Sequence, residues 1–165
     1  MKKLFLILVN ILFIFNISFA NEISGLAKVV DGDTIKINGK KIRLFGIDAP
    51  EKNQICKKNW FSFNFLTLDK DYFCGKVTTK KLKKFILNKK IKCVGNRLDK
   101  YNRLIAICYK ENKDINLWLV RNGLAVSYKK YSTKYSFQEK QAKKEKIGLW
   151  QGKFDMPWQW RKKNK

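Results

Sequence analysis

The chain has no histidine among its 165 residues, and its 13 acidic residues are outnumbered by 37 lysines and arginines. Without histidine, the protein cannot form a Ser-His-Asp triad, use a histidine general base or ligate zinc through histidine. Acid–base chemistry must therefore fall to a carboxylate, a lysine, a tyrosine or a metal ion with its water. The sequence also lacks internal repeats and long linkers, which favours a single domain.

The few acidic residues are not spread evenly, because four of them lie with one arginine inside a segment of 21 residues. The segment contains Asp31, Asp33, Arg43, Asp48 and Glu51. Taken singly, each is explained as well by a turn or a surface ion pair. Taken together, they favour a site for a hard cation, because Ca²⁺ and Mg²⁺ are bound by oxygen ligands. Antiparallel strands can bring Asp33 and Asp48 to one end of a barrel, with Glu51 close enough to accept a proton from an attacking water.

The charge balance predicts a polyanionic partner. The formal net charge is +24, which favours binding to nucleic acid or to an anionic membrane surface. Aromatic residues make up 14% of the chain. Base stacking on aromatic side chains usually accompanies a basic groove that binds nucleic acid, so the composition favours that partner over a lipid surface.

The first 20 residues resemble an export signal. Lys2 and Lys3 precede an apolar segment at 4–15, and Ala20 ends a small-x-small cleavage site, so the mature chain is expected to begin at Asn21. An uncleaved membrane anchor is the alternative, but the apolar run is short against the roughly 20 residues that a spanning helix needs. Cleavage would leave 145 of the 165 residues and lower the formal charge from +24 to +22. We therefore expect an exported protein, in the periplasm or the medium.

All four cysteines lie after the predicted cleavage site, at Cys56, Cys74, Cys93 and Cys108. An even number of cysteines in an exported chain predicts two disulfides, with three possible pairings. If the segment between Cys93 and Cys108 is a hairpin that turns at its midpoint, these two residues lie opposite each other and close enough to bridge. This favours Cys93–Cys108 and leaves Cys56–Cys74, whose loop closure is worth roughly 3 kcal/mol in the chain-entropy model.

Strand patterns occupy the first and the middle parts of the predicted domain. Residues 23–47 predict three short strands, in which Asn38-Gly39 is a strong signal for a type I′ hairpin turn. A further pair of strands is expected at 91–98 and 103–109. The segment 52–74 is polar and aromatic, and we expect it to be a loop.

The sequence predicts three helices, over 76–88, 115–122 and 134–146. Asp114 is the expected N-cap of the second helix, and Gly123 ends it. Ser136 and Glu139 have the spacing of a capping box in the third helix, and Gly148 ends that helix. Five strands with three helices predict an α+β fold, a five-stranded OB-type barrel with helices packed on it.

We divide the chain into a signal peptide at 1–20, a domain at 21–150 and a tail at 151–165. The tail is first aromatic and then basic. Its Met156–Trp160 segment could dock two tryptophans onto the domain, whereas Arg161–Lys165 is expected to be frayed.

Several short motifs follow one another along the chain, each weak alone and specific in series: Asp31–Thr34, Ile42–Leu44, Gly46–Glu51, Asp99–Arg103, Val120–Ala125 and Gln141–Lys146. Together they resemble the thermonuclease family, also called staphylococcal nuclease-like. The resemblance extends over about residues 23–150. The cysteines, the segment 52–74 and the tail resemble an exported bacterial branch of this family.

The resemblance implies a five-stranded OB barrel with three helices and a Ca²⁺-dependent phosphodiesterase. Such an enzyme hydrolyses DNA and RNA with little sequence specificity, cleaving the 5′ P–O bond to leave 3′-phosphate ends. We expect single-stranded or unpaired nucleic acid to be preferred, and a monomer without a stable protein partner.

The resemblance also implies roles for single residues. Asp33, Asp48 and the carbonyl group of Ala49 would be calcium ligands, with Asp31 as a nearby acid that acts through water. Glu51 would be the general base or would orient the water. The remaining roles are phosphate clamps at Arg43 and Arg103, contacts to a substrate phosphate and sugar at Lys100 and Tyr101, and flanking of a base by Tyr128 and Tyr131.

Family members often have glycine before the second clamp arginine, whereas this chain has Asn102, a residue that tolerates the left-handed conformation.

Two functions from other classes remain as alternatives. A non-catalytic OB-fold module would bind nucleic acid tightly without cutting it, because OB barrels often bind oligonucleotides only. A cationic envelope protein would bind anionic lipid and would leave the clustered acids without a role.

Overall fold

The computed structural model of the chain describes residues 21–63 and 66–164. The predicted signal peptide therefore lies outside the described residues. Within the described part, no helix is both long and apolar enough to cross a membrane.

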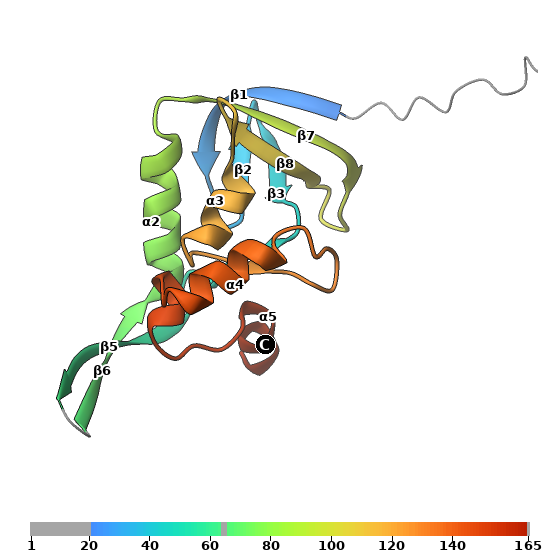
Figure 1. Ribbon diagram of the computed structural model, residues 1–165. Helices are drawn as coiled ribbons and strands as arrows, with labels where there is room; N and C mark the ends of the chain where they lie inside the picture. Colours follow the sequence, from blue (N-terminus) through green and yellow to red (C-terminus); the bar gives the residue numbers. More distant parts are fainter. Residues whose placement is uncertain (1–20, 64–65, 165) are drawn as a thin grey trace, which may run out of the picture.

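Five strands form a closed barrel, as the sequence predicts (Figure 1). They are β1 (Asn21–Val29), β2 (Thr34–Ile37), β3 (Lys40–Leu44), β7 (Lys90–Leu98) and β8 (Leu104–Lys110). Neighbouring strands pair antiparallel in the order β3-β2-β1-β7-β8. The barrel closes where β3 pairs with β8 in parallel, with Ile42 opposite Leu104. A two-residue strand, β9 (Lys113–Asp114), extends the edge beside β8.

Local sequence signals explain the shape of the barrel. Asn38 and Gly39 have φ angles of 47° and 82°, so both central residues of the β2–β3 turn have the positive φ of a type I′ turn. Alternate strand residues face inward, and Ile35, Ile37 and Ile42 are fully buried in the core. The period of two therefore sets which side of each strand fills the barrel.

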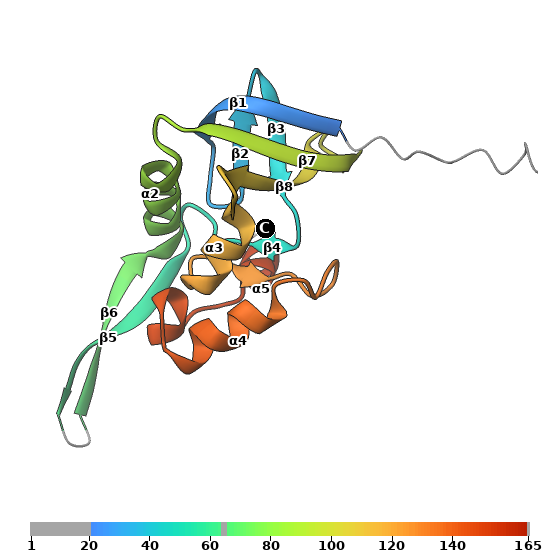
Figure 2. The ribbon, with the colours of Figure 1, turned by 45° about the horizontal axis from the view of Figure 1, so that its top comes forward.

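Helices cover the side and the lower end of the barrel (Figures 1 and 2). They are α2 (Cys74–Ile86), α3 (Ile115–Arg121), α4 (Ser136–Lys144), the 3₁₀ helix η1 (Gly148–Gln151) and α5 (Pro157–Lys163). Leu82 and Ile86 of α2, and Leu119 and Val120 of α3, are buried in the main core. The described part thus has four α-helices, one more than predicted, and the extra helix is α5 in the tail.

The helix caps are predicted correctly at α3 but not at α4. Asp114 accepts a hydrogen bond from the backbone N–H of Leu117 at 2.8 Å, as an N-cap should. The expected capping box at α4 is wrong, because the N-cap is Tyr135 and no side chain caps it. Glu139 is turned inward instead, where it is buried and accepts a hydrogen bond from the backbone N–H of Ser127 at 3.3 Å.

The segment predicted to be a loop is instead an antiparallel hairpin of β5 (Ile55–Phe63) and β6 (Leu66–Phe73). It projects away from the barrel in both ribbon views (Figures 1 and 2). Trp60 and Phe61 follow each other on β5 and are both largely exposed, so the hairpin does not have one apolar and one polar face. The alternation that marks a half-buried strand is therefore missing from the sequence.

Both predicted disulfide pairs are present in the structure. Cys93 and Cys108 lie directly opposite each other in the β7–β8 register, with Cα atoms 4.0 Å apart. Cys56 and Cys74 have Cα atoms 5.7 Å apart and join the start of β5 to the first residue of α2. The second bridge anchors the base of the projecting hairpin beside the loop that carries Glu51.

The tail is docked, and the expected fraying from Arg161 onward is wrong. Lys57 on β5 and Lys153 exchange two backbone hydrogen bonds, of 2.8 Å and 3.1 Å. Phe154, Met156 and Trp158 then pack on a small core around the Cys56–Cys74 bridge. Pro157 begins α5, where its fixed φ and missing N–H suit the first helical position.

Candidate active site

The barrel and the tail enclose a cleft of about 810 Å³. Its walls come from the turns after β1 and β3, from the β7–β8 hairpin and from the segment after β10 (Val126–Ser127). Most of the residues predicted to form the site line this cleft: Asp31, Asp33, Arg43, Ala49, Glu51, Lys100, Tyr101, Arg103, Tyr128 and Tyr131.

Two acidic loops are locked together at the bottom of the cleft. Asp31 accepts a hydrogen bond from the backbone N–H of Asp33 at 3.0 Å, which shapes the first loop. Asp33 in turn accepts one from the backbone N–H of Ala49 at 2.9 Å, which ties this loop to the second. A Cβ atom on Gly32 would come within 2.7 Å of the Ala49 Cβ, so the two loops approach each other closely only because residue 32 is glycine.

Strand β4 (Ile47–Asp48) carries the second carboxylate into the interior. It pairs with β10, which sets Asp48 opposite Val126, and the Asp48 side chain is fully buried. Arg43 on β3 bridges the two acidic loops through an ion pair with Asp33 and a 2.9 Å hydrogen bond to Asp48. Its guanidinium also donates to the carbonyl oxygen of Ile47 at 3.3 Å.

Burial changes the proton affinities of two groups in this cluster. It lowers the pKa of the Arg43 guanidinium, although the neighbouring Asp48 carboxylate opposes that change. It also raises the pKa of Asp31, although a hydrogen bond with Thr34 and the charge of Arg43 partly offset the effect. The two directions are expected for charged groups that are removed from water.

A second guanidinium, which the sequence did not predict, enters the cluster from α5. Arg161 donates to both oxygens of Asp48, at 3.1 Å and 2.8 Å, and to Glu51 Oε1 at 2.8 Å. Burial alone would lower the pKa of Arg161, but the hydrogen bonds to the two carboxylates outweigh it and raise that pKa. Arg161 is therefore a permanent cation in the cleft wall.

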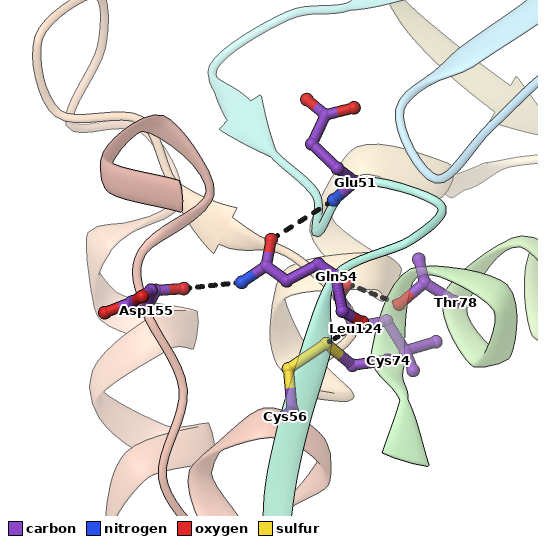
Figure 3. The surroundings of a disulfide bond; sticks show 7 residues. All are labelled: Glu51, Gln54, Cys56, Cys74, Thr78, Leu124 and Asp155. Atoms are coloured by element: carbon purple, nitrogen blue, oxygen red, sulfur yellow. Dashed lines mark hydrogen bonds between the residues drawn. A yellow bond between two sulfur atoms is a disulfide. The ribbon is translucent and has the colours of Figure 1, made fainter. Parts of the chain in front are cut away.

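The loop that carries Glu51 is held by the buried side chain of Gln54 (Figure 3). Gln54 Oε1 accepts from the backbone N–H of Glu51 at 3.2 Å, and Gln54 Nε2 donates to the carbonyl oxygen of Asp155 in the tail at 2.7 Å. A Cβ atom on Gly75 of α2 would lie 1.9 Å from the Glu51 carbonyl oxygen. The start of α2, the tail and this loop therefore fix one another.

The opposite wall of the cleft is the β7–β8 hairpin. Arg103 donates to Asp99 Oδ2 at 2.7 Å and to Thr34 Oγ1 at 3.3 Å, which points its guanidinium toward the acidic loops. Burial by itself would raise the pKa of Asp99, but hydrogen bonds from Arg103 and from two backbone N–H groups hold it below its ordinary value. Asn102 has a φ of 58°, so it adopts the left-handed conformation expected there.

Aromatic side chains extend from the cluster along two walls. The exposed ring of Tyr101 lies 5.0 Å from Lys100 Nζ and 5.3 Å from the Arg103 guanidinium carbon. Tyr128 contacts Tyr131 edge to face at 4.9 Å and stacks on Trp158 of α5 at 5.4 Å. Trp158, like Arg161, was not predicted as part of the site.

The donor atoms of the cluster suit a hard cation. Asp33 and Asp48 both converge on one positively charged group, the Arg43 guanidinium, and both offer only oxygen. Within residues 21–63 and 66–164, no group of three or more acidic, cysteine or histidine side chains is arranged to hold a metal ion. A metal ion at this position would have the two carboxylates Asp33 and Asp48 to bind, and it would compete with the guanidinium groups that already contact them.

Comparison with known proteins identifies the family. Residues 41–152 match the family described as staphylococcal nuclease homologue. The chain is 31% identical to an uncharacterized endonuclease of Haemophilus influenzae over 148 residues, which cover 85% of this chain and 73% of the relative. It is 30% identical to an uncharacterized endonuclease of Escherichia coli O157:H7, over 92% of this chain and 94% of the relative.

A further relative is the succinoglycan biosynthesis protein ExoI of Rhizobium meliloti, 34% identical over 79% of this chain and 66% of the relative. The chain belongs to the staphylococcal nuclease homologue family. This membership makes it a nuclease, a hydrolase of phosphodiester bonds, in a family that is generally metal-dependent. Its substrate is therefore nucleic acid.

Proposed function

We propose that the protein is a calcium-dependent nuclease of DNA and RNA with little sequence specificity, which cleaves the 5′ P–O bond and leaves 3′-phosphate ends. The observation that carries this proposal is that Asp33, Arg43, Glu51 and Arg103 line one cleft and that the buried Asp48 lies behind its wall, bonded to Arg43 and Arg161. The set contains oxygen ligands, a proton acceptor and two guanidinium groups, which phosphodiester hydrolysis requires together.

The proposed metal ligands are the carboxylates of Asp33 and Asp48 and the carbonyl group of Ala49. When bound there, a calcium ion supplies a positive charge that polarises a phosphoryl oxygen. The chain's own residues do the rest. Asp31 shapes the loop that presents Asp33, and Arg43 joins the two ligand-bearing loops.

Glu51 is the proposed base, which accepts a proton from the attacking water or orients that water. Its carboxylate lies at the edge of the cleft and is about 39% exposed, so water can reach it. Arg43 and Arg103 would grip the phosphate oxygens as negative charge develops, because the planar guanidinium matches two such oxygens.

The outer walls suit an unpaired strand. Lys100 and Tyr101 are proposed to contact a phosphate and its sugar, and Tyr128 and Tyr131 to flank a base. Stacking requires an exposed base face and tolerates every base, which favours single-stranded substrates without sequence preference. The high positive charge would add salt-sensitive affinity for the backbone.

The test is cleavage of single-stranded DNA and RNA by the purified protein in Ca²⁺ and in a chelator, with end-group analysis of the products. We expect cleavage only in Ca²⁺, with 3′-phosphate ends, and a loss of at least roughly 10² in rate for Glu51→Gln. Glu145→Gln is the matched control, because this acid pairs with Arg121 on the surface outside the cleft.

Three results would contradict the proposal: no cleavage, cleavage that a chelator leaves untouched, or full activity of Glu51→Gln. Tight binding of DNA without any product would support a non-catalytic OB-fold module instead. Binding to anionic vesicles that is indifferent to Ca²⁺ would support a lipid-binding role.

The two disulfides suggest an extracellular or periplasmic environment, where such bonds persist. Export through a cleaved signal at 1–20 stays a prediction, as does a monomer without a stable protein partner. We further propose that residues 151–165 belong to the working nuclease unit, together with 21–150, because the tail contributes Arg161 to the cleft.

A further inference from the structure

The C-terminal helix places a cation against two residues of the proposed machinery. Arg161 holds both oxygens of Asp48, a proposed metal ligand, and one oxygen of Glu51, the proposed base. These contacts join residues that are 113 and 110 positions apart in the chain. Arg161 also lies beyond residues 41–152, which match the family, so the contact is an addition to the matched part of the chain.

The hydrogen-bonding capacity of the two proposed ligands is nearly filled. Asp48 Oδ1 accepts from both Arg43 and Arg161, and Asp48 Oδ2 accepts from Arg161. Asp33 Oδ1 interacts with Arg43 and accepts from the hydroxyl of Thr34. A carboxylate oxygen has about two lone-pair sites. A divalent ion that binds Asp48 Oδ1 must therefore displace one of the two guanidinium groups.

Arg161 is the guanidinium that can leave. Arg43 extends from a barrel strand, is also held by Asp33 and the Ile47 carbonyl oxygen, and is 17% exposed. Arg161 is about twice as exposed, at 35%, and extends from a seven-residue helix near the end of the chain. Short helices are marginal by themselves, so α5 depends on its contacts with the domain.

The tail is anchored before α5 rather than at its end. The Lys57–Lys153 backbone pair and the Gln54–Asp155 hydrogen bond hold the residues that precede the helix. On α5 itself, Trp158 stacks on Tyr128, and Arg161 supplies the ion pairs to the acid cluster. The end of the helix can thus separate from the cluster while its base stays attached.

We propose that Arg161 and a divalent cation compete for Asp48 and Glu51, so that metal binding at the proposed site requires α5 to withdraw its guanidinium. This inference rests on the proposed function, because it takes Asp48 as a metal ligand. It makes the tail an intramolecular competitor for the metal. It also means that Glu51 Oε1 loses its hydrogen bond to Arg161 when the metal binds.

The test is the affinity for Ca²⁺, measured by titration calorimetry on the full-length protein without nucleic acid. We expect Arg161→Gln to bind Ca²⁺ at least about tenfold more tightly than the wild type, because the competing state is lost. Arg161→Lys should lie between the two, since it keeps the charge without the two-pronged geometry. Lys162→Gln is the control for net charge. This exposed neighbour on α5 should change the affinity by less than about twofold.

A merely structural role for Arg161 predicts the opposite result, because loss of the contact would then disorder the ligands and weaken Ca²⁺ binding. Equal or weaker binding by Arg161→Gln would therefore overturn the competition and leave the proposed function intact. If neither folded protein binds Ca²⁺ at millimolar concentration, both the competition and the proposed calcium site are wrong.

Amide hydrogen exchange of the wild type gives an independent measurement that needs no variant. We expect the amides of residues 158–163 to exchange faster in saturating Ca²⁺ than in a chelator, because α5 loses its ion pairs to the cluster. Unchanged or slower exchange in this helix under saturating Ca²⁺ would overturn the competition.

Discussion

Replacing the buried carboxylate of Asp48 tests how the acid cluster is stabilised. This fully buried side chain accepts three hydrogen bonds from Arg43 and Arg161. Asp48→Asn keeps the size of the side chain but removes the negative charge between two guanidinium groups. Breaking one partner of a buried ion pair costs about 3–5 kcal/mol.

Two features lower the expected cost. Arg43 and Arg161 each retain a second carboxylate, Asp33 and Glu51, and the asparagine still offers one acceptor oxygen. Arg161 is also partly exposed, so solvent screens its interaction. We therefore expect a loss of about 2–3 kcal/mol, which corresponds to about 6–9 °C in Tm for a domain of this size.

Thermal and urea unfolding in a chelator measure this loss, with Glu145→Gln as the control for an exposed ion pair that should cost less than about 1 kcal/mol. A Ca²⁺ concentration of 100 times Kd should then stabilise the wild type by about 2.7 kcal/mol and so raise its Tm. The Tm of Asp48→Asn should stay unchanged. An unaltered Tm of Asp48→Asn in the chelator would refute the reasoning on the buried pair. Equal Ca²⁺ stabilisation of both proteins would refute the assignment of Asp48 as a ligand.

Two further changes probe the walls of the cleft. Because the pKa of Asp99 is lowered in the folded protein, its carboxylate stabilises the fold above about pH 4, and this contribution is lost as the pH falls through the lowered pKa. Asp99→Asn should therefore melt below the wild type at pH 7, with a smaller difference at pH 3; the same deficit at both pH values would contradict this. Gly75→Ala should destabilise the protein by about 1–3 kcal/mol and lower cleavage, because its Cβ would meet the Glu51 carbonyl oxygen at 1.9 Å. Replacing its exposed neighbour in Lys76→Ala should change the free energy of unfolding by less than about 1 kcal/mol. A Gly75→Ala protein with the Tm of the wild type would show that this close approach is not needed.

Features that depend on neighbouring residues could be predicted from the sequence. The Asn38-Gly39 turn, the Asp114 cap and the register that places Cys93 opposite Cys108 all follow from local spacing. The β5–β6 hairpin could not be predicted in the same way. Its exposed aromatic residues do not alternate between a buried and an exposed face. Because β5 and β6 pair only with each other among the described strands, their sequences show no apolar stripe that would reveal the pairing.

The residues of the candidate site also differ in whether local sequence could predict them. The acidic loops and the β7–β8 hairpin carry short motifs, so Asp33, Arg43, Asp48 and Arg103 could be selected before their positions were known. Arg161 could not, because its partners lie more than 100 positions away and it is followed by two lysines in a basic chain end. The one available signal was the Met156–Arg161 segment, whose tryptophans and proline indicated that this part of the tail docks on the domain.

Arginines and lysines are distributed differently in this protein. Only five of its 37 cationic residues are arginines, and four of these, Arg43, Arg97, Arg103 and Arg161, line the cleft. Among the lysines of the described residues, Lys100 alone lines it. Lysine is a strongly hydrated point charge, whereas arginine presents a planar fork that binds carboxylates and phosphates at close range. The lysines are therefore suited to supply a long-range field that attracts a polyanion, and the arginines to make short-range contacts with it. An arginine that is matched to phosphate is equally matched to the cleft's own carboxylates, and this shared match is the chemical basis of the competition that we propose for Arg161.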